Sequence, residues 1–521
     1  MKRVVTLYFL LSGLTLFAQN ANDPFARMRQ QFDDFKQAKQ AEFEAFTAKQ
    51  NEEFSAFMQE AWQLFENFQT QKLQLDKPKM ADAPVAPGTE KPTENIVGAQ
   101  ITPPATQSTN SKGVYVLRTT VTPQGSIQTY TPSATGKNNG VVEPDGISFS
   151  FYGRTLFMPC SPNLRIRANG VSERHAADYF RAMAQLPRET RQLWHAVQQQ
   201  AYDFGLNEWG HFCLLRSVAE TLLTSSDECA LFLFYMLRNE GGYKVKIARG
   251  QDSGRLTLLL ALDNEKEVYS YTFFRFPENE RQVKYYAVYG GGKAKESIYT
   301  YAFTQQETSL KQMRLDFDRT LNIGDCDQQR TLQVQKTGTT IHLPYNSSHM
   351  AYLNDVPMTV FPIYFSSEVP TESQQALQRH FEPYARRYSQ QQMVDLLLNF
   401  VQTAFAYRTD RQQFGYEKYF YPEEVIGYPY SDCEDRSALF SWLVTSLTGL
   451  QVIGLQYEGH VATAVAFTDP NAGKGDYFSY GGRRYYVCDP TYINASIGMT
   501  MPQFKGKTPK VIRLKTISHT L

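Results

Sequence analysis

The feature that most restricts the fold is a pair of similar stretches, one in each half of the chain beyond residue 112. Residues 225–262 and 433–467 each predict an apolar helix that stops at a glycine, Gly241 or Gly449, and then strands. Helices and a β-rich region precede each stretch in the same order. We therefore predict a duplicated α+β module. The alternative is that any two helix–strand units share such hydrophobic registers.

The β-rich regions that precede the helices lie at 113–168 and 313–368. They contain runs typical of strands, such as GISFSFYG (146–153) and VPMTVFPIYF (356–365). Because strands and helices occupy separate blocks, the predicted class is α+β.

The first 112 residues predict a different organisation. Residues 1–19 place two basic residues before the apolar run VVTLYFLLSGLTLF, as in a secretory signal peptide. In residues 20–76, F-x-x-F pairs recur every 11 residues, which predicts one long amphipathic helix with an aromatic stripe. Residues 77–112 are rich in Pro, Thr and Ala and predict an extended linker. We expect a periplasmic or secreted protein whose stripe at 25–75 packs on its own domain, self-associates or binds a partner or membrane surface.

Charge and cysteine usage exclude several functional classes. The net charge is +1, which gives no electrostatic basis for binding nucleic acid or an anionic membrane. Beyond the N-terminus, no apolar run is long enough for a stable membrane span. The six cysteines are widely spaced and form no C-x-x-C pair, so we expect neither a disulfide scaffold nor a zinc site. No cofactor and no metal are predicted.

Three residues of the second stretch suit nucleophilic catalysis. Cys433 comes at the start of a predicted buried helix, where backbone N–H groups favour a thiolate, although the following Glu434 and Asp435 oppose it. His460 begins the strand GHVATAVAF among small residues, and Asp489 ends the strand RRYYVCDPTY. If these two strands are neighbours, Asp489 lies beside His460. The three residues then provide a nucleophile, a base and a group that orients the base.

Other functions for these residues remain open at this level. A cysteine in an oxidising compartment can be paired or simply buried, and Cys488 is a candidate partner for Cys433. Alternation along the strand turns Cys488 away from Asp489, however, which disfavours this bond. We expect Cys433 to be a free, reactive thiol. A histidine on a strand can be a satisfied core residue.

The runs CEDRSALF, GHV and VCDPT resemble the transglutaminase-like superfamily, which is papain-like in its chemistry. The resemblance covers roughly residues 390–495. It implies Cys433 as nucleophile, His460 as base and Asp489 as orienter. Two departures, Ser431-Asp432 before the cysteine and Val461-Ala462 after the histidine, leave the substrate pocket open. The backbone N–H of Cys433 is one expected oxyanion donor.

The second oxyanion donor is not fixed by the motif. The candidates are Gln413, Tyr416 and Tyr430.

The first stretch lacks the same residues. Ser225 aligns with Cys433, Arg255 aligns with His460, and no clear Asp-Pro follows. Cys229 comes four residues too late and is expected inside the helix. The first module is therefore predicted to be degenerate and non-catalytic.

These inferences combine into one expectation. The chain is expected to be a secreted transglutaminase-like thiol enzyme that acts on protein or peptide amides through a thioester, more by hydrolysis than by cross-linking. The alternative is a non-enzymatic adhesion or assembly module that works through the N-terminal helix. The predicted parts are a signal peptide (1–19), an amphipathic helix (20–76), a linker (77–112), a degenerate module with a β-rich start (113–312) and a β-rich segment plus catalytic domain (313–521).

Overall fold

The computed structural model describes residues 140–263, 267–269, 271–278, 281–290, 296–301 and 310–514, with short strands at 108–109, 115–116 and 119–121. The chain divides into two compact units, Met1–Met80 and Ala81–Leu521, and every described residue belongs to the second. The predicted signal peptide and amphipathic helix lie outside the described residues, as does nearly all of the linker.

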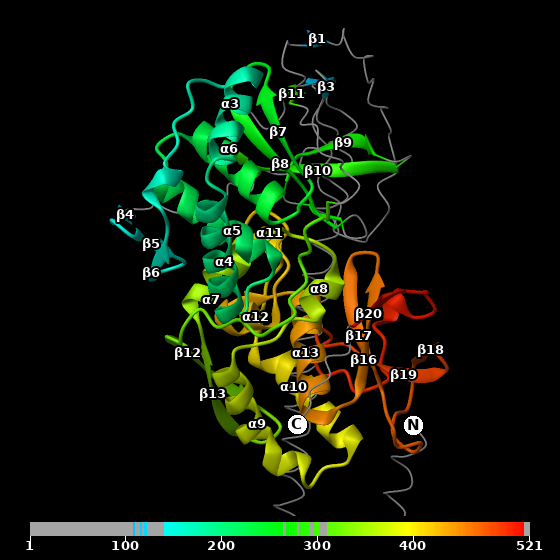
Figure 1. Cartoon of the computed structure of the whole chain (residues 1–521). Helices are drawn as coiled ribbons and strands as arrows, with labels where there is room; N and C mark the ends of the chain where they lie inside the picture. The colour runs from blue at the N-terminus through cyan, green and yellow to red at the C-terminus, as the bar shows by residue number, and fades with distance from the viewer. Residues whose placement is uncertain are drawn as a thin grey trace, which may run out of the picture. The chain divides into compact units, whose positions relative to one another are not determined.

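The described residues form a mixed α+β structure, as predicted from the sequence (Figure 1). The elements before residue 301 are β1 (Ser108–Thr109), β2 (Tyr115–Val116), β3 (Thr119–Val121), β4 (Val141–Val142), β5 (Gly146–Phe151), β6 (Arg154–Pro159), α3 (Glu173–Met183), α4 (Pro187–Asp203), α5 (Glu208–Leu222), α6 (Ser226–Tyr235), β7 (Val245–Gly250), β8 (Leu256–Ala261), β9 (Phe273–Glu278), β10 (Arg281–Gly290) and β11 (Ile298–Thr300).

The elements after residue 310 continue in a similar order. They are β12 (Gln328–Val334), β13 (Thr339–Tyr345), α7 (Ser347–Asp355), α8 (Phe361–Phe365), α9 (Thr371–Ala385), α10 (Gln390–Ala404), β14 (Ala406–Tyr407), α11 (Asp410–Gln413), α12 (Pro422–Gly427), β15 (Tyr430–Ser431), α13 (Cys433–Thr448), β16 (Gln451–Tyr457), β17 (His460–Ala466), β18 (Tyr477–Tyr480), β19 (Arg483–Cys488), a 3₁₀ turn (Pro502–Phe504) and β20 (Lys510–Arg513).

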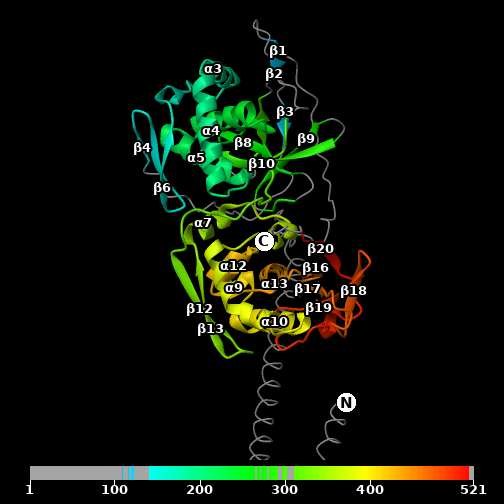
Figure 2. The same ribbon diagram turned by 60° about the horizontal axis from the view of Figure 1, so that its bottom comes forward.

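Two antiparallel sheets have the same strand order. The first runs β3-β11-β7-β8-β10-β9, and the second, read from its other edge, runs β20-β16-β17-β19-β18. Apart from the additional β3, the strands correspond one to one in sequence order, and each sheet follows a buried helix, α6 or α13. A β-hairpin precedes the helices in both halves, β5–β6 and β12–β13, and the latter lies against α9 and α10 (Figure 2).

The second sheet curls toward closure. The guanidinium of Arg513, on the edge strand β20, lies 5.4 Å from the ring of Tyr480 on the opposite edge strand β18. Helix α13 covers this sheet by packing on β16 and β17 (Figure 1). Its residues 434–444 are all buried, and it ends at Gly449, whose φ of 68° is a left-handed C-terminal conformation that glycine adopts without strain.

The sequence prediction for residues 356–365 is wrong. Instead of a strand, Phe361–Phe365 forms the short helix α8. Pro362 has no N–H to give to a sheet but fits the first turn of a helix, where that group has no partner. Phe361 and Phe365 are buried in the core, so tertiary packing overrides their preference for strands.

The hydrophobic core crosses the predicted boundary between residues 312 and 313. One continuous cluster joins Leu231 of α6, Phe365 of α8 and Val461 of β17. Met313 also forms a bridge with Leu262, directly after β8.

A buried polar group links the two halves through α7. Asp355 Oδ2 accepts hydrogen bonds from Arg216 (2.5 Å) and from Tyr152 (2.5 Å), and its backbone oxygen accepts one from Trp209 (3.0 Å). The Arg216 and Asp355 side chains are each only 9% exposed. The free energy of desolvating both charges is compensated only while both partners are present.

We predict that Arg216→Met destabilises the protein by about 3–5 kcal/mol, because it leaves a buried carboxylate without its cation. Denaturant unfolding at neutral pH measures the change. The matched control is Arg386→Met, which removes an exposed ion pair with Glu382 and should cost no more than about 0.5 kcal/mol. Equal costs for the two variants would contradict the structural role of Arg216.

Candidate functional site

The two strand residues of the predicted triad are brought together. His460 Nε2 donates a hydrogen bond to Asp489 Oδ2 (2.8 Å), and both side chains are buried. β17 and β19 pair with Thr463 opposite Cys488, so the next residue, Asp489, comes opposite Ala462. The small side chain of Ala462 leaves room for the carboxylate to reach His460 on the same face.

The local chain conformation fixes both groups. A two-residue turn places His460 directly opposite Tyr457, and Gly459 permits the turn with a φ of 70°. The other carboxylate oxygen of Asp489, Oδ1, accepts hydrogen bonds from the backbone N–H groups of Thr491 (2.9 Å) and Tyr492 (3.2 Å). The carboxylate is therefore held on both oxygens.

Two groups that the sequence analysis missed support this pair. The Gln402 amide on α10 donates to the backbone oxygens of Asp489 (3.0 Å) and Tyr492 (2.8 Å), which fixes the loop after β19. The ring of Phe504 stacks on His460 with centroids 4.9 Å apart and planes inclined by 7°. Phe504 lies beyond the region of family resemblance, and no sequence motif marks it.

Cys433 is the first residue of α13 and lies against the strand that carries His460. Burial and neighbouring acids raise the pKa of Cys433, and the backbone N–H of Val461, the residue after His460, acts on the sulfur in the opposite direction. Ser437, one turn along the helix, donates to the Val461 carbonyl oxygen (3.1 Å). The first turn of α13 is thereby docked on the start of β17.

The thiol itself points to an acid. Cys433 Sγ donates to Glu434 Oε2 (3.0 Å), and among the described residues no hydrogen bond joins it to His460. Burial, followed by Glu434 and Asp432, raises the pKa of Cys433 well above its usual value. The resting group is therefore a protonated thiol rather than a thiolate.

The cysteines are free thiols in the described part of the chain. Cys433 is half-buried, whereas Cys488 is buried in the core beneath the second sheet, where alternation places it. Cys229 lies inside α6, as expected from its position, and its thiol donates to the Ala219 carbonyl oxygen (3.4 Å).

Five carboxyl groups surround the start of α13. Burial is the main cause that raises the pKa of Asp410 to about 10, and the negative charges of Asp435 and Glu434 add to it. Burial, together with the charge of Glu434, raises the pKa of Glu417 to about 8. The pKa values of Asp432 and Asp435 are also raised well above their ordinary range by burial and neighbouring carboxylates. The sequence motif around Cys433 contains Asp432, Glu434 and Asp435, but it gives no sign that Asp410 and Glu417 lie nearby.

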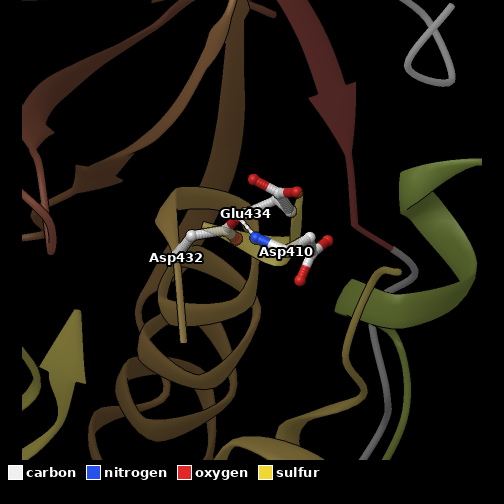
Figure 3. A group of neighbouring side chains, drawn as sticks. All are labelled: Asp410, Asp432 and Glu434. Carbon is white, nitrogen blue, oxygen red and sulfur yellow. Dashed lines mark hydrogen bonds between the residues drawn. The ribbon is translucent and has the colours of Figure 1, made fainter. Parts of the chain in front are cut away.

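Three of these carboxylates converge. Oxygen atoms of Asp410, Asp432 and Glu434 lie within 4.8 Å of one another, and Figure 3 shows the Asp432 side chain directed toward the other two residues. Asp432 Oδ1 is buried without a hydrogen-bond partner in the described part of the chain. Such oxygens are ligands for hard cations such as Ca²⁺ or Mg²⁺, so this group could geometrically hold one.

In the first half, an ion pair lies at the start of α6. Arg255, just before β8, pairs with Asp227 in the first turn of α6 (3.2 Å) and donates to Ser226. Ser226 is the first residue of α6, and Ser225 is its N-cap. Ser225, which the sequence alignment places opposite Cys433, therefore lies one residue before its helix, whereas Cys433 is the first residue of α13.

The three predicted side-chain oxyanion donors have different surroundings. Gln413 ends α11, the Tyr416 ring lies against Phe414 (6.0 Å), and the Tyr430 ring is covered by the guanidinium of Arg408 (3.8 Å).

No protein-family model, curated protein or solved structure matches the chain. Among the described residues, no helix has the length and apolar character needed to cross a membrane.

We predict that Glu434→Gln makes Cys433 more reactive. The substitution removes the strongest negative neighbour of the thiol, so the pKa of Cys433 falls and the thiolate fraction at a given pH rises. The rate of iodoacetamide alkylation, measured from pH 6 to pH 10, should increase severalfold at pH 8, with the profile moved toward lower pH. Glu382→Gln, which removes an exposed carboxylate on α9, should leave the profile in place.

Proposed function

We propose that the chain is a transglutaminase-like thiol enzyme, with Cys433 as nucleophile, His460 as general base and Asp489 as the group that orients it. The buried hydrogen bond between His460 and Asp489, next to the helix start that bears Cys433, carries this proposal. A histidine and a carboxylate packed at the start of a helix with a free thiol are the parts needed for acyl transfer.

The tautomer of His460 follows from its partner. Nε2–H donates to the Asp489 carboxylate, so Nδ1 is the basic nitrogen. No described residue forms a hydrogen bond to Nδ1. The raised pKa of Cys433 implies that His460 removes the thiol proton during attack, after the thiol has turned from Glu434 toward the imidazole.

The reaction then proceeds in two halves. Cys433 sulfur attacks the amide carbonyl carbon, and His460 transfers the thiol proton to the departing nitrogen as the C–N bond breaks. Water, deprotonated by His460, attacks the resulting thioester, and the sulfur leaves and regains its proton. An amine in place of water would give cross-linking, and we favour hydrolysis.

The wider organisation belongs to the same proposal. The common strand order of the two sheets supports two transglutaminase-like modules, and the Arg255–Asp227 pair supports a first module without catalysis. Secretion to the periplasm or beyond, a protein or peptide substrate, and self-association or partner binding through residues 25–75 remain proposals that rest on the sequence. The adhesion alternative concerns that same helix, and no described residue favours it.

The proposal predicts that Cys433→Ala abolishes turnover of p-nitrophenyl acetate and of amide substrates. His460→Ala and Asp489→Asn should lower the rate of acylation by at least about a hundredfold, because the base is removed or loses its tautomer. Full activity of Cys433→Ala would refute the proposal.

Arg255→Ala and Ser225→Ala serve as matched controls in the first module. We predict a loss smaller than about tenfold, equivalent to about 1.4 kcal/mol of transition-state stabilisation. A greater loss from either variant, with unchanged thermal stability, would show that the first module takes part in catalysis.

A further inference from the structure

Three buried carboxyl groups from two separate parts of the chain meet beside the start of α13. β14 pairs in parallel with β15, and Asp410 lies three residues after β14, whereas Asp432 and Glu434 follow β15. The backbone N–H of Asp410 donates to Asp432 Oδ2 (3.4 Å), which joins the two segments. Strand pairing therefore holds these three residues, called the acidic cluster below, in one place.

The acidic cluster is buried and has no protein cation. The exposed fraction is 2% for Asp410 and 6% for each of the other two residues. In the described part of the chain no lysine or arginine forms an ion pair with the cluster, since Lys418 donates to Glu424 (2.5 Å) and Arg436 to the backbone oxygen of Phe405 (2.6 Å). Like charges that are buried together repel one another, so a positive ion among them would stabilise the fold.

One oxygen of the acidic cluster accepts no hydrogen bond. Asp432 Oδ1 is buried and has no donor within the residues that the structure describes. Figure 3 shows the Asp432 side chain directed toward Asp410 and Glu434. This oxygen has lost its water without gaining a donor, which costs free energy that contact with a cation would recover.

The spacing of the oxygens fits a single hard ion. One oxygen from each residue of the acidic cluster lies within 4.8 Å of the other two. Two oxygens on opposite sides of a Ca²⁺ ion are roughly 4.6–5.2 Å apart, because each lies about 2.3–2.6 Å from the metal. All three oxygens can therefore belong to one coordination shell.

The kind of ligand selects the kind of ion. The set contains carboxylate oxygens and neither nitrogen nor sulfur, which favours Ca²⁺ or Mg²⁺ over zinc. Mg²⁺ holds its ligands closer, at about 2.0–2.1 Å, and usually keeps several waters with only one or two carboxylates. A buried group of three carboxylates suits Ca²⁺ better.

We propose that Asp410, Asp432 and Glu434 form a binding site for one hard divalent cation, with Ca²⁺ preferred to Mg²⁺. The ion neutralises the acidic cluster and occupies the side on which Asp432 Oδ1 lacks a donor. Because Ca²⁺ takes more than three oxygens, second carboxylate oxygens or water complete its shell. This site goes beyond the acyl transfer proposed above, and its ligands are not the residues assigned to that reaction.

The test measures binding of Ca²⁺ to the full-length protein after treatment with a chelator and its removal. Isothermal titration with CaCl₂ should give one ion per chain, with a Kd at or below about 1 mM. Asp432→Asn, Asp410→Asn and Glu434→Gln should each weaken binding by at least about tenfold, because each removes a charged ligand. Glu382→Gln, which changes an exposed carboxylate on α9, should bind Ca²⁺ as the wild type does.

Thermal unfolding distinguishes a lost site from a lost fold. In chelator, Asp432→Asn should unfold at the same temperature as wild type or higher, since one charge leaves the acidic cluster while the amide oxygen still accepts the Asp410 N–H. With about 10 mM Ca²⁺ the midpoint of wild type should rise and that of the variant should not, because an ion that binds only the folded chain stabilises it. If Asp432→Asn does not fold, Asp410→Asn and Glu434→Gln provide the same comparison.

Three results would overturn the proposal. The first is that the folded wild-type protein binds no Ca²⁺ at about 10 mM, well above the expected Kd. The second is binding that all three variants retain, which would place the ion elsewhere. The third, tighter binding of Mg²⁺ than of Ca²⁺, would overturn the assignment to calcium.

Failure of the proposed function has a separate signature. Cys433→Ala should still bind Ca²⁺, because the proposed ligands are carboxylates. Its loss of acylation by p-nitrophenyl acetate tests the enzyme, whereas its Ca²⁺ titration tests the site. If Cys433→Ala abolishes Ca²⁺ binding in the folded protein, the sulfur is a ligand and the carboxylate site is wrong.

Discussion

The docking of the first turn of α13 on a single residue, Val461, determines the geometry of the site. Its backbone N–H reaches the Cys433 sulfur, and its carbonyl oxygen accepts from Ser437. Because Val461 follows His460 directly, the contact that packs the helix on the sheet also brings the proposed nucleophile near the proposed base. Core packing and the placement of Cys433 therefore depend on the same few atoms, and a substitution that shifts the helix also shifts the thiol.

The charges around this contact are unusual for a cysteine that is proposed as a nucleophile. Thiol enzymes commonly lower the pKa of the cysteine with cations and helix termini, whereas here Asp432, Glu434 and the buried acids beyond them raise it. The helix dipole and the Val461 N–H act in the opposite direction but do not prevail. A thiol held in its protonated form resists oxidation, because the thiolate is the form that is oxidised.

The sequence predicted those parts that follow from local periodicity. Alternation along β17 and β19 correctly placed Asp489 near His460 and turned Cys488 away, since strand period and neighbouring strands suffice for both. The sequence pattern could not reveal that four further residues lie at the site, because only tertiary folding brings them there: Asp410, Glu417, Gln402 and Phe504. The strand prediction for residues 356–365 was wrong for a related reason. The aromatic residues of this run favour strands, but Pro362 and burial in the core favour the short helix that forms at Phe361–Phe365.

The position of Phe504 has a consequence for how the molecule is made. His460 and Asp489 are synthesised before the segment that covers them, and Phe504 arrives with the turn that leads into the edge strand β20. Until Phe504 has been synthesised, no ring from this turn can stack on the imidazole of His460. The order of synthesis thus adds the ring contact on His460 only after the segment that contains both His460 and Asp489 has been made.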